Sequence, residues 1–289
     1  RWDVVEDKMA DKYSAPLGDM RFVLNHLVDL KRLSEVEGFK MVTPDLMNQV
    51  LEEAARFAED VVAPLNQAGD RQGVRLENGV VRMPEGFAKC YQQYVDAGWP
   101  AVCGDIDYGG QGLPWTLSIA LSEIWQAANM SLANAWMLTQ GAVEAIQVHG
   151  TSEQKATYLP KLISGEWSGT MNLTEPNAGS DVGALRTSAV RNNGEWKITG
   201  TKIFITHGDQ DMTKNVVHLV LARTPDGPEG TRGISLFVVP KFLVDSDGQL
   251  GKRNDVRPVS LEHKLGHMAS PTAVMSYGDN EGAIGYLLG

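Results

Sequence analysis

The sequence predicts an α+β protein in which an all-helical N-terminal domain is followed by a small β-barrel domain. Between residues 43 and 165, apolar side chains recur at spacings of three and four, the period of an amphipathic helix. From Met171 onward the pattern changes to short β-rich runs separated by turn residues. A helical block followed by a strand block favours α+β over alternating βαβ units. The predicted parts are an N-terminal extension, a helical domain and a β domain, at residues 1–42, 43–170 and 171–289.

The leader segment at residues 13–42 has the apolar pattern of one short helix, formed by Phe22, Val23, Leu27 and Leu30. It has no independent core, so we expect it to pack on the segment that follows. The chain begins with Arg1, and Met9 followed by Ala10 is the more natural start. Residues 1–8 are therefore interpreted as upstream translation or a cloning remnant.

The helical block has recognisable starts. Thr43 and Pro44 open its first helix, since threonine caps a helix and proline suits its first position, and the pattern ends near Pro64. Thr151 and Gln154 form a capping box at the start of its last helix. Further helical patterns lie between them, at residues 84–99, 115–129 and 131–149. We expect Trp115, Trp125 and Trp136 to lie in the helical core.

The β block is expected to contain strands that are separated by turns rich in proline, aspartate and glycine. The predicted strands are residues 196–199, 201–206, 216–222, 234–239 and 271–277, and the turns are residues 225–228 and 245–248.

Composition excludes several classes of protein. The net charge of −10 argues against nucleic acid as a partner, because phosphate binding needs a basic surface. Cys90 and Cys103 are too few for a disulfide scaffold, which favours a reducing, cytoplasmic location. We find no apolar run of the length that spans a bilayer.

One loop stands where the helical block meets the β block, at residues 174–181. Pro176 blocks a strand ladder, Gly179 permits close backbone approach, and short polar side chains flank both. Such a loop can present several N–H groups to an anion or to ligand carbonyls. Considered alone, such a loop is more commonly a plain surface turn held by a hydrogen bond of Asn177 or Asp181.

The loop matches the signature of the acyl-CoA dehydrogenase family, which it resembles at Thr174, Glu175, Ala178, Gly179, Ser180, Asp181 and Ala184. The run from Lys202 to Thr206 is similar to the second flavin strand of that family, with Phe204 where tryptophan is more common. Asn172 also departs from the pattern, because the family usually has a small residue there.

Other segments extend the resemblance along the chain from residue 13. They are the loop at 108–114, the helix at 150–163 and the segment at 262–272. The leader at residues 16–22 resembles a long-form bacterial subgroup that includes 3-methylmercaptopropionyl-CoA dehydrogenases.

The resemblance implies a cofactor and its contacts. Family members bind FAD between the β domain and a C-terminal four-helix domain. By resemblance, Met171, Leu173 and Thr174 line the flavin edge, Phe204 stacks near the ring, and Thr206 donates toward N5. Gly179, Ser180 and Ile205 complete the expected cofactor-binding set, and Ser180 also contacts the acyl-CoA substrate.

No catalytic residue is assigned. The family's base is a glutamate of the C-terminal helical domain or of its first helix, so we expect it beyond Gly289 and expect the four-helix domain to be absent from this chain. Glu175 is expected to hold its loop by hydrogen bonds to backbone, and Asp105, Asp107 and Asp181 to act as caps or turn residues. His263 and His267 are four residues apart, but Gly266 argues against a helical metal site, so no metal is expected.

The expected function of the intact protein is FAD-dependent α,β-dehydrogenation of an acyl-CoA thioester to a 2-enoyl-CoA, as in fatty-acid β-oxidation. The resemblance implies electron-transferring flavoprotein as the acceptor and a homodimer or homotetramer. Two alternatives stay open: an acyl-CoA oxidase on the same scaffold, and a non-catalytic flavin-binding fragment. The acyl chain is not predicted.

Overall fold

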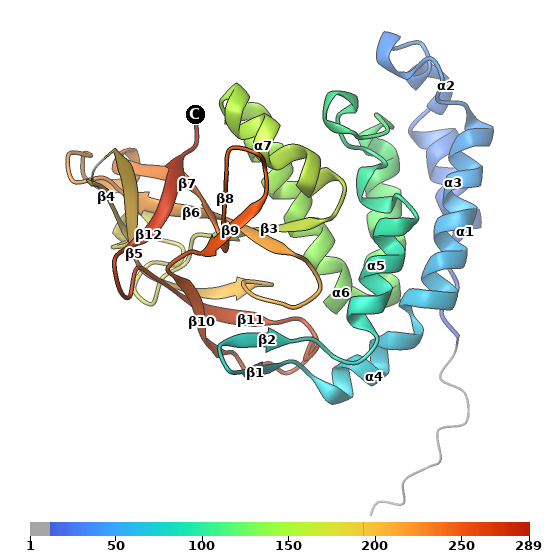
Figure 1. Cartoon of the computed structure of the whole chain (residues 1–289). Helices are drawn as coiled ribbons and strands as arrows, with labels where there is room; N and C mark the ends of the chain where they lie inside the picture. Colours follow the sequence, from blue (N-terminus) through green and yellow to red (C-terminus); the bar gives the residue numbers. More distant parts are fainter. Residues whose placement is uncertain (1–11, 193) are drawn as a thin grey trace, which may run out of the picture. The chain divides into compact units, whose positions relative to one another are not determined.

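The computed structural model describes residues 12–192 and 194–289 (Figure 1). The interpretation of residues 1–8 and of Met9 lies outside the described residues. The chain divides into two compact units, one extending to Gln67 with Leu113–Met130 added, the other formed by Ala68–Gly112 and Ser131–Gly289. Because these units interleave along the sequence, the predicted boundaries at residues 42 and 170 stay predictions.

In the first unit the leader forms helix α1 (Leu17–Phe22), which continues through a π-helical turn (Val23–Leu27), and helix α2 (Leu30–Leu33). The expectation that it packs on the following segment is confirmed, because Arg21 bonds Asn48 and Glu52 of helix α3 (Pro44–Phe57). The predicted apolar face is wrong for most of its positions. Met20, Leu24 and Leu30 are buried, whereas Phe22 is 59% and Leu27 71% exposed.

Helix α3 starts at the predicted cap, where Thr43 Oγ1 accepts from Leu46 N. The predicted end near Pro64 is confirmed, because the helix continues to Val62 and a new helix, which was not predicted, begins at Pro64. A π-helical turn at Ala58–Val62 leads directly into helix α4 (Pro64–Gln72). Proline begins a helix here because a first-turn residue needs no donor to the preceding turn.

Helix α6 (Trp115–His149) has one non-helical residue, Asn129, with φ −162° and ψ 90°. This kink confirms the predicted break between residues 129 and 131. Of the three tryptophans expected in the core, Trp125 and Trp136 are buried, but Trp115 is 51% exposed.

The second unit contains helix α5 (Phe87–Asp96) and helix α7 (Ser152–Ile163). The predicted capping box is confirmed, since Gln154 N donates to Thr151 Oγ1 and Thr151 N donates to Gln154 Oε1. A short hairpin of β1 (Arg75–Glu77) and β2 (Val80–Arg82) escaped prediction. Its turn residues, Asn78 and Gly79, both have positive φ, the Asn-Gly signal of a tight hairpin.

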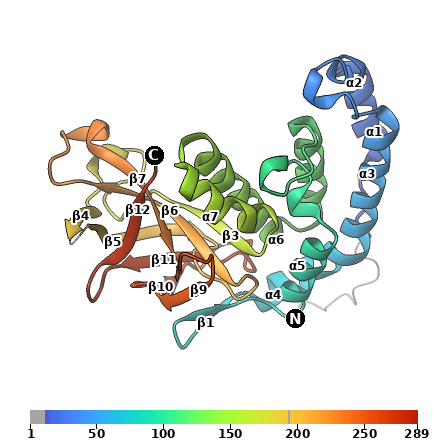
Figure 2. The same ribbon diagram turned by 45° about the horizontal axis from the view of Figure 1, so that its top comes forward.

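The β strands of this unit form a closed five-stranded ring, which confirms the predicted small barrel (Figures 1 and 2). Around the ring the order is β4, β5, β12, β7 and β6, and Ser188 of β4 closes it against Arg223 of β6. The bounds are β4 Ser188–Asn192, β5 Glu195–Thr206, β6 Asn215–Arg223, β7 Ile234–Pro240 and β12 Ala283–Leu287.

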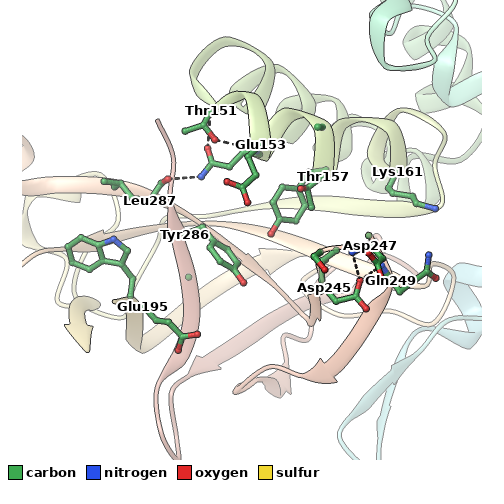
Figure 3. A pocket seen from close by; sticks show the side chains of 18 of the residues that line it. Thr151, Glu153, Thr157, Lys161, Glu195, Asp245, Asp247, Gln249, Tyr286 and Leu287 are labelled. Atoms are coloured by element: carbon green, nitrogen blue, oxygen red, sulfur yellow. Dashed lines mark hydrogen bonds between the residues drawn. The ribbon is translucent and has the colours of Figure 1, made fainter. Parts of the chain in front are cut away.

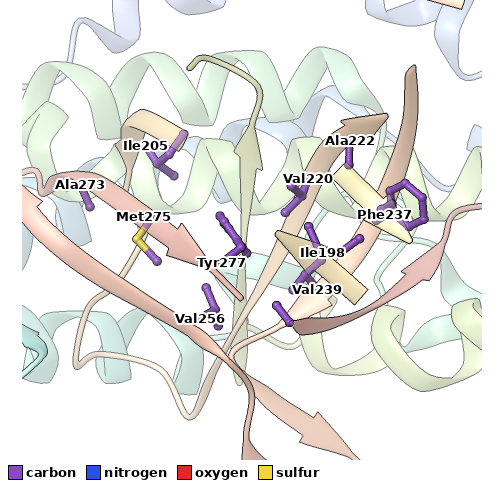
Figure 4. Packing of buried hydrophobic residues seen from close by; sticks show 12 residues of the cluster. Ile198, Ile205, Val220, Ala222, Phe237, Val239, Val256, Ala273, Met275 and Tyr277 are labelled. Atoms are coloured by element: carbon purple, nitrogen blue, oxygen red, sulfur yellow. The ribbon is translucent and has the colours of Figure 1, made fainter. Parts of the chain in front are cut away.

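Further strands extend the ring. Strand β3 (Trp167–Asn172) pairs in parallel with β6, while β11 (Thr272–Tyr277) joins β5 to β10 (Val256–Leu261). Strands β8 (Phe242–Val244) and β9 (Leu250–Arg253) form a separate hairpin. Buried apolar side chains that include Ile198, Val220, Phe237 and Val239 fill the interior (Figure 4).

Strand β5 is continuous through Gly200, which the sequence had suggested as a break. Glycine is required there by a close approach, because an added Cβ would lie 2.3 Å from Thr187 Oγ1. Within the described part of the chain, every helix is too short or too polar to cross a bilayer.

Candidate functional site

Two segments of the second unit meet at the predicted site. The first is the loop at residues 173–181, which follows β3, and the second is the end of β5 at residues 202–206. Ile203 N donates to Thr174 O at 2.9 Å and joins them. The loop turns back on itself where Glu175 and Ala178 exchange backbone hydrogen bonds. The structure therefore brings Thr174 beside the strand end that carries Phe204 and Thr206.

The exposure of the predicted residues differs. Gly179 and Ser180 are exposed, and the partly exposed residues are Met171, Leu173, Thr174 and Thr206. Ile205 is 2% exposed and packs in the buried cluster of Figure 4, so its side chain faces the interior. A ligand could meet only the backbone of Ile205.

Phe204 sits on a β-bulge. In the pairing with β11, Ala273 faces Ile205 and Met275 faces Lys202, so Val274 opposes two residues of β5. Phe204 has φ 60° and is 57% exposed. A bulge with a non-glycine residue in the left-handed region is strained and is often found at binding sites, where it redirects a side chain. Here it presents an aromatic ring to the outside.

A buried ion pair lies under these segments. The side chains of Lys202 and Glu175 are 0% and 3% exposed, and Lys202 Nζ donates to Glu175 Oε1 at 2.8 Å. Burial alone would raise the pKa of the Glu175 carboxyl, but hydrogen bonds from Lys202 and from the backbone of Arg186 and Thr187 hold that pKa below its usual value. Burial lowers the pKa of Lys202, and Glu175 opposes the shift. The expectation that Glu175 holds its loop by backbone hydrogen bonds is confirmed.

A chain of buried hydrogen bonds runs behind β3. Tyr277 OH donates to Asn172 Oδ1 and Asn172 Nδ2 donates to Thr170 Oγ1, both at 2.8 Å. The chain of hydrogen bonds continues from Thr170 Oγ1 to His218 Nδ1, also at 2.8 Å. Sequence analysis missed this chain, although the departure at Asn172 was its visible sign. The asparagine has a dedicated partner in Tyr277.

Other sequence candidates have ordinary roles. Asp105 Oδ1 accepts from Asp107 N as a cap. Among residues 12–192 and 194–289, no group of three or more His, Cys, Asp or Glu side chains could hold a metal ion. Arg223 was not predicted. It joins the turn at Val182–Ala184, directly after the signature loop, to a neighbouring turn by donating to Gly183 O and Gly230 O.

A cavity of about 1040 Å³ lies elsewhere in the second unit, between α7, the 244–249 turn and β12 (Figure 3). Its charged lining residues include Glu153, Glu195 and Lys161. Asp245, also in its lining, accepts hydrogen bonds from the backbone of Asp247 and Gln249. None of the residues predicted to bind flavin or substrate lines this cavity.

Because two histidines are buried, we expect the folded chain to lose stability in acid. Burial lowers the pKa of His207 to about 4 and that of His218 to about 3, from 6.5. The unfolded chain therefore binds more protons than the folded chain below pH 6.5, so stability is greatest above that pH and falls as the pH drops from 6.5 toward 4. We expect the midpoint of thermal unfolding to fall across this window.

The measurement is thermal unfolding followed by circular dichroism between pH 4.5 and 8. His218→Gln should reduce the slope between pH 6.5 and 4.5, because one of the two buried histidines is gone. His263→Gln, at an exposed position, is the matched control. Equal slopes for His218→Gln and the unmodified chain would contradict the assignment.

The residues present fit a flavin. A flat aromatic ligand needs an exposed ring to stack on, and Phe204 offers one from a fixed backbone. A ring with carbonyl and amide edges needs hydrogen-bonding groups, and Thr174 and Thr206 are partly exposed on the joined segments. The exposed backbone of Gly179 and Ser180 can form hydrogen bonds with other polar groups of the ligand.

Comparison with known proteins places the chain in a family. Residues 45–166 match the acyl-CoA dehydrogenase N-terminal domain and residues 170–279 match the acyl-CoA dehydrogenase middle domain. A 3-methylmercaptopropionyl-CoA dehydrogenase of Ruegeria pomeroyi is 50% identical over 96% of this chain and 47% of its own length. A butyryl-CoA dehydrogenase of Syntrophomonas wolfei is 36% identical over 96% of this chain and 47% of its own length.

Among solved structures, an acyl-CoA dehydrogenase of Bacillus anthracis complexed with FAD has the same fold, with a TM-score of 0.67 and 22% identity. The similarity covers 85% of this chain and 37% of that one. The chain thus spans about half the length of the curated relatives named above.

Proposed function

Because the chain belongs to the acyl-CoA dehydrogenase family, we propose that the intact protein carries out FAD-dependent α,β-dehydrogenation of an acyl-CoA thioester to a 2-enoyl-CoA. The observation that supports it most is the exposed ring of Phe204, held on a bulge beside the signature loop. FAD, when bound, would supply the acceptor for the hydride that leaves the substrate Cβ.

The chain's own residues would bind and orient the cofactor. We assign stacking to Phe204 and hydrogen bonding to Thr174 and Thr206, with Met171 and Leu173 as an apolar edge. Fixed donors favour flavin reduction, because reduction builds negative charge on the ring. We assign Gly179 and Ser180 to backbone and side-chain contacts with cofactor and acyl-CoA, and Ile205 to backbone contact alone.

We assign no base to residues 1–289 and expect it from a glutamate of the helical region that follows the β domain in the family. Proton abstraction from Cα needs direct reach of a base to that carbon. The most prominent carboxylate of the loop, Glu175, is buried and bonded to Lys202, Arg186 and Thr187. It is therefore occupied in holding the loop.

We propose a short acyl chain, because the two curated relatives named above act, by their names, on 3-methylmercaptopropionyl-CoA and butyryl-CoA. We further propose electron-transferring flavoprotein as the acceptor, a homodimer or homotetramer, and a cytoplasmic location in keeping with the free thiols of Cys90 and Cys103.

The test uses the intact protein with FAD, kept free of oxygen. Addition of butyryl-CoA or 3-methylmercaptopropionyl-CoA is expected to bleach the visible flavin absorbance, and electron-transferring flavoprotein should restore it. Rapid restoration by oxygen with release of hydrogen peroxide would instead indicate the oxidase alternative. Bound FAD without bleaching by any acyl-CoA would favour a non-catalytic flavin-binding protein. Residues 1–289 alone are expected to give no turnover.

A further inference from the structure

We propose that Lys202 is a positioning residue for the flavin site, because its ammonium group fixes the signature loop against the strand end that carries Phe204. The inference rests on the proposed function, since it concerns the cofactor assigned there. Lys202 would touch neither flavin nor substrate, and would act through the backbone of the loop.

The contacts of the ammonium group carry the argument. Lys202 Nζ donates to Leu173 O at 2.9 Å and to Glu175 Oε1 at 2.8 Å, so one side chain of β5 bonds two residues of the loop. The next residue of β5 continues the connection, because Ile203 N donates to Thr174 O at 2.9 Å. The carbonyls of Leu173 and Thr174, which are consecutive, are thus both held from β5.

Glu175 extends the connection to the other side of the loop. Its Oε2 accepts from Arg186 N at 2.6 Å and its Oε1 accepts from Thr187 N at 3.0 Å. The loop is therefore fixed at its start, where it leaves β3, and against the segment that leads into β4. Between these points lies the exposed turn that carries Gly179 and Ser180.

The position of Lys202 in the strand matters as much as its bonds. It is the last paired residue of β5 before the bulge, opposite Met275, and Phe204 is two residues further on. A bulge loses regular ladder hydrogen bonds, so the backbone around it needs other restraints. Lys202 and Ile203 provide them from the same strand, which couples the direction of the Phe204 ring to the position of Thr174.

Stability alone does not account for a fully buried lysine. Apolar residues of similar volume often replace a buried ion pair at no loss in stability, because each charge must be removed from water. An apolar pair cannot donate hydrogen bonds, whereas Lys202 donates to the carbonyl of Leu173 and to the carboxylate of Glu175. The pair is thus suited to setting geometry, and its chosen acceptor, Leu173 O, belongs to a residue assigned to the flavin edge.

The experiment compares variants of the intact protein. We measure the FAD dissociation constant, the reduction potential of bound flavin and the thermal midpoint. Lys202→Met is expected to weaken FAD binding by at least about tenfold and to shift the potential, because a misplaced loop no longer presents its groups to the ring. Lys241→Met is the matched control, since it breaks another buried pair, with Asp209 at 2.5 Å, outside both segments.

A second variant separates positioning from folding. Lys202→Met leaves the buried Glu175 charge without its cation, whereas Lys202→Met/Glu175→Gln removes both charges and should recover most of the thermal midpoint. We expect its FAD affinity and potential to stay shifted. The proposal is overturned if this double variant binds FAD with unmodified affinity and potential. It is equally overturned if Lys241→Met weakens FAD binding as much, or if neither Lys202 variant folds.

The wild-type protein distinguishes this proposal from the proposed function. If wild-type protein binds no FAD, the proposed function fails and the positioning role fails with it. If wild-type protein binds FAD and bleaches with acyl-CoA while the Lys202 variants match it, only the positioning role fails.

Discussion

Replacement of Phe204 by glycine is expected to weaken FAD binding to the intact protein by up to about tenfold while leaving its free energy of unfolding nearly unchanged. The aromatic ring is 57% exposed, so its loss removes little buried apolar surface from the folded chain. Stacking of one aromatic ring on another contributes about 0.5–1.5 kcal/mol beyond area burial, and 1.4 kcal/mol corresponds to about tenfold in affinity.

The backbone explains why stability is preserved. Phe204 has φ 60°, a conformation that costs a residue with a Cβ roughly 1–2 kcal/mol and glycine almost nothing. Glycine also gives the unfolded chain more freedom, which costs a similar amount, roughly 0.5–1 kcal/mol. The two terms offset each other, so the variant should unfold at nearly the same urea concentration as the wild type.

Two controls sharpen the measurement. Phe204→Trp keeps a ring at the bulge and should retain FAD binding. Asn78→Gly relaxes a comparable positive φ of 52° in the turn between β1 and β2, and should leave FAD affinity unchanged. FAD binding of Phe204→Gly with wild-type affinity would remove Phe204 from the cofactor site.

Features with a local signal could be predicted from the sequence. The caps at Thr43 and Thr151 follow from short-range hydrogen bonding, and the structure has both. The change from helical to strand periodicity near Met171 lies close to the point where helix α7 ends at Ile163 and strand β3 begins at Trp167. The signature loop is contiguous, so its members stay neighbours in the fold.

Features that depend on contacts with distant parts of the chain could not be predicted from local sequence. The predicted apolar face of the leader included Phe22 and Leu27, whereas the fold buries Met20 and Leu24, because packing on helix α3 decides which face is covered. Ile205 looked like a cofactor residue because its neighbours do, but the bulge turns Phe204 outward and leaves Ile205 in the core.

The side-chain pairs that were missed at the site join residues that are distant in sequence. Glu175 and Lys202 are 27 positions apart, and Asn172 and Tyr277 are 105 apart. The available signs were a lysine directly before the apolar run Ile203–Ile205 and an asparagine in place of a small residue, and neither sign identifies its partner.

Replacement of Asn172 by alanine is expected to lower the free energy of unfolding by about 2–4 kcal/mol, because two buried polar groups lose a partner. Asn172 is 0% exposed and Tyr277 is 1% exposed. Without the asparagine, the Tyr277 hydroxyl loses its acceptor and Thr170 Oγ1 loses a donor. No alanine atom can satisfy either group.

A double-mutant cycle tests whether the cost comes from that pairing. Tyr277→Phe removes the hydroxyl. In the Asn172→Ala background, position 277 then has no buried polar group that lacks a hydrogen-bond partner. Losing both partners is less harmful than losing one, so Asn172→Ala/Tyr277→Phe should be more stable than the sum of the single effects by about 1–2 kcal/mol. Urea unfolding of the four proteins measures this coupling. Additivity within about 0.5 kcal/mol would contradict it. In that case a small residue at position 172, as the family usually has, would need no compensating change at Tyr277.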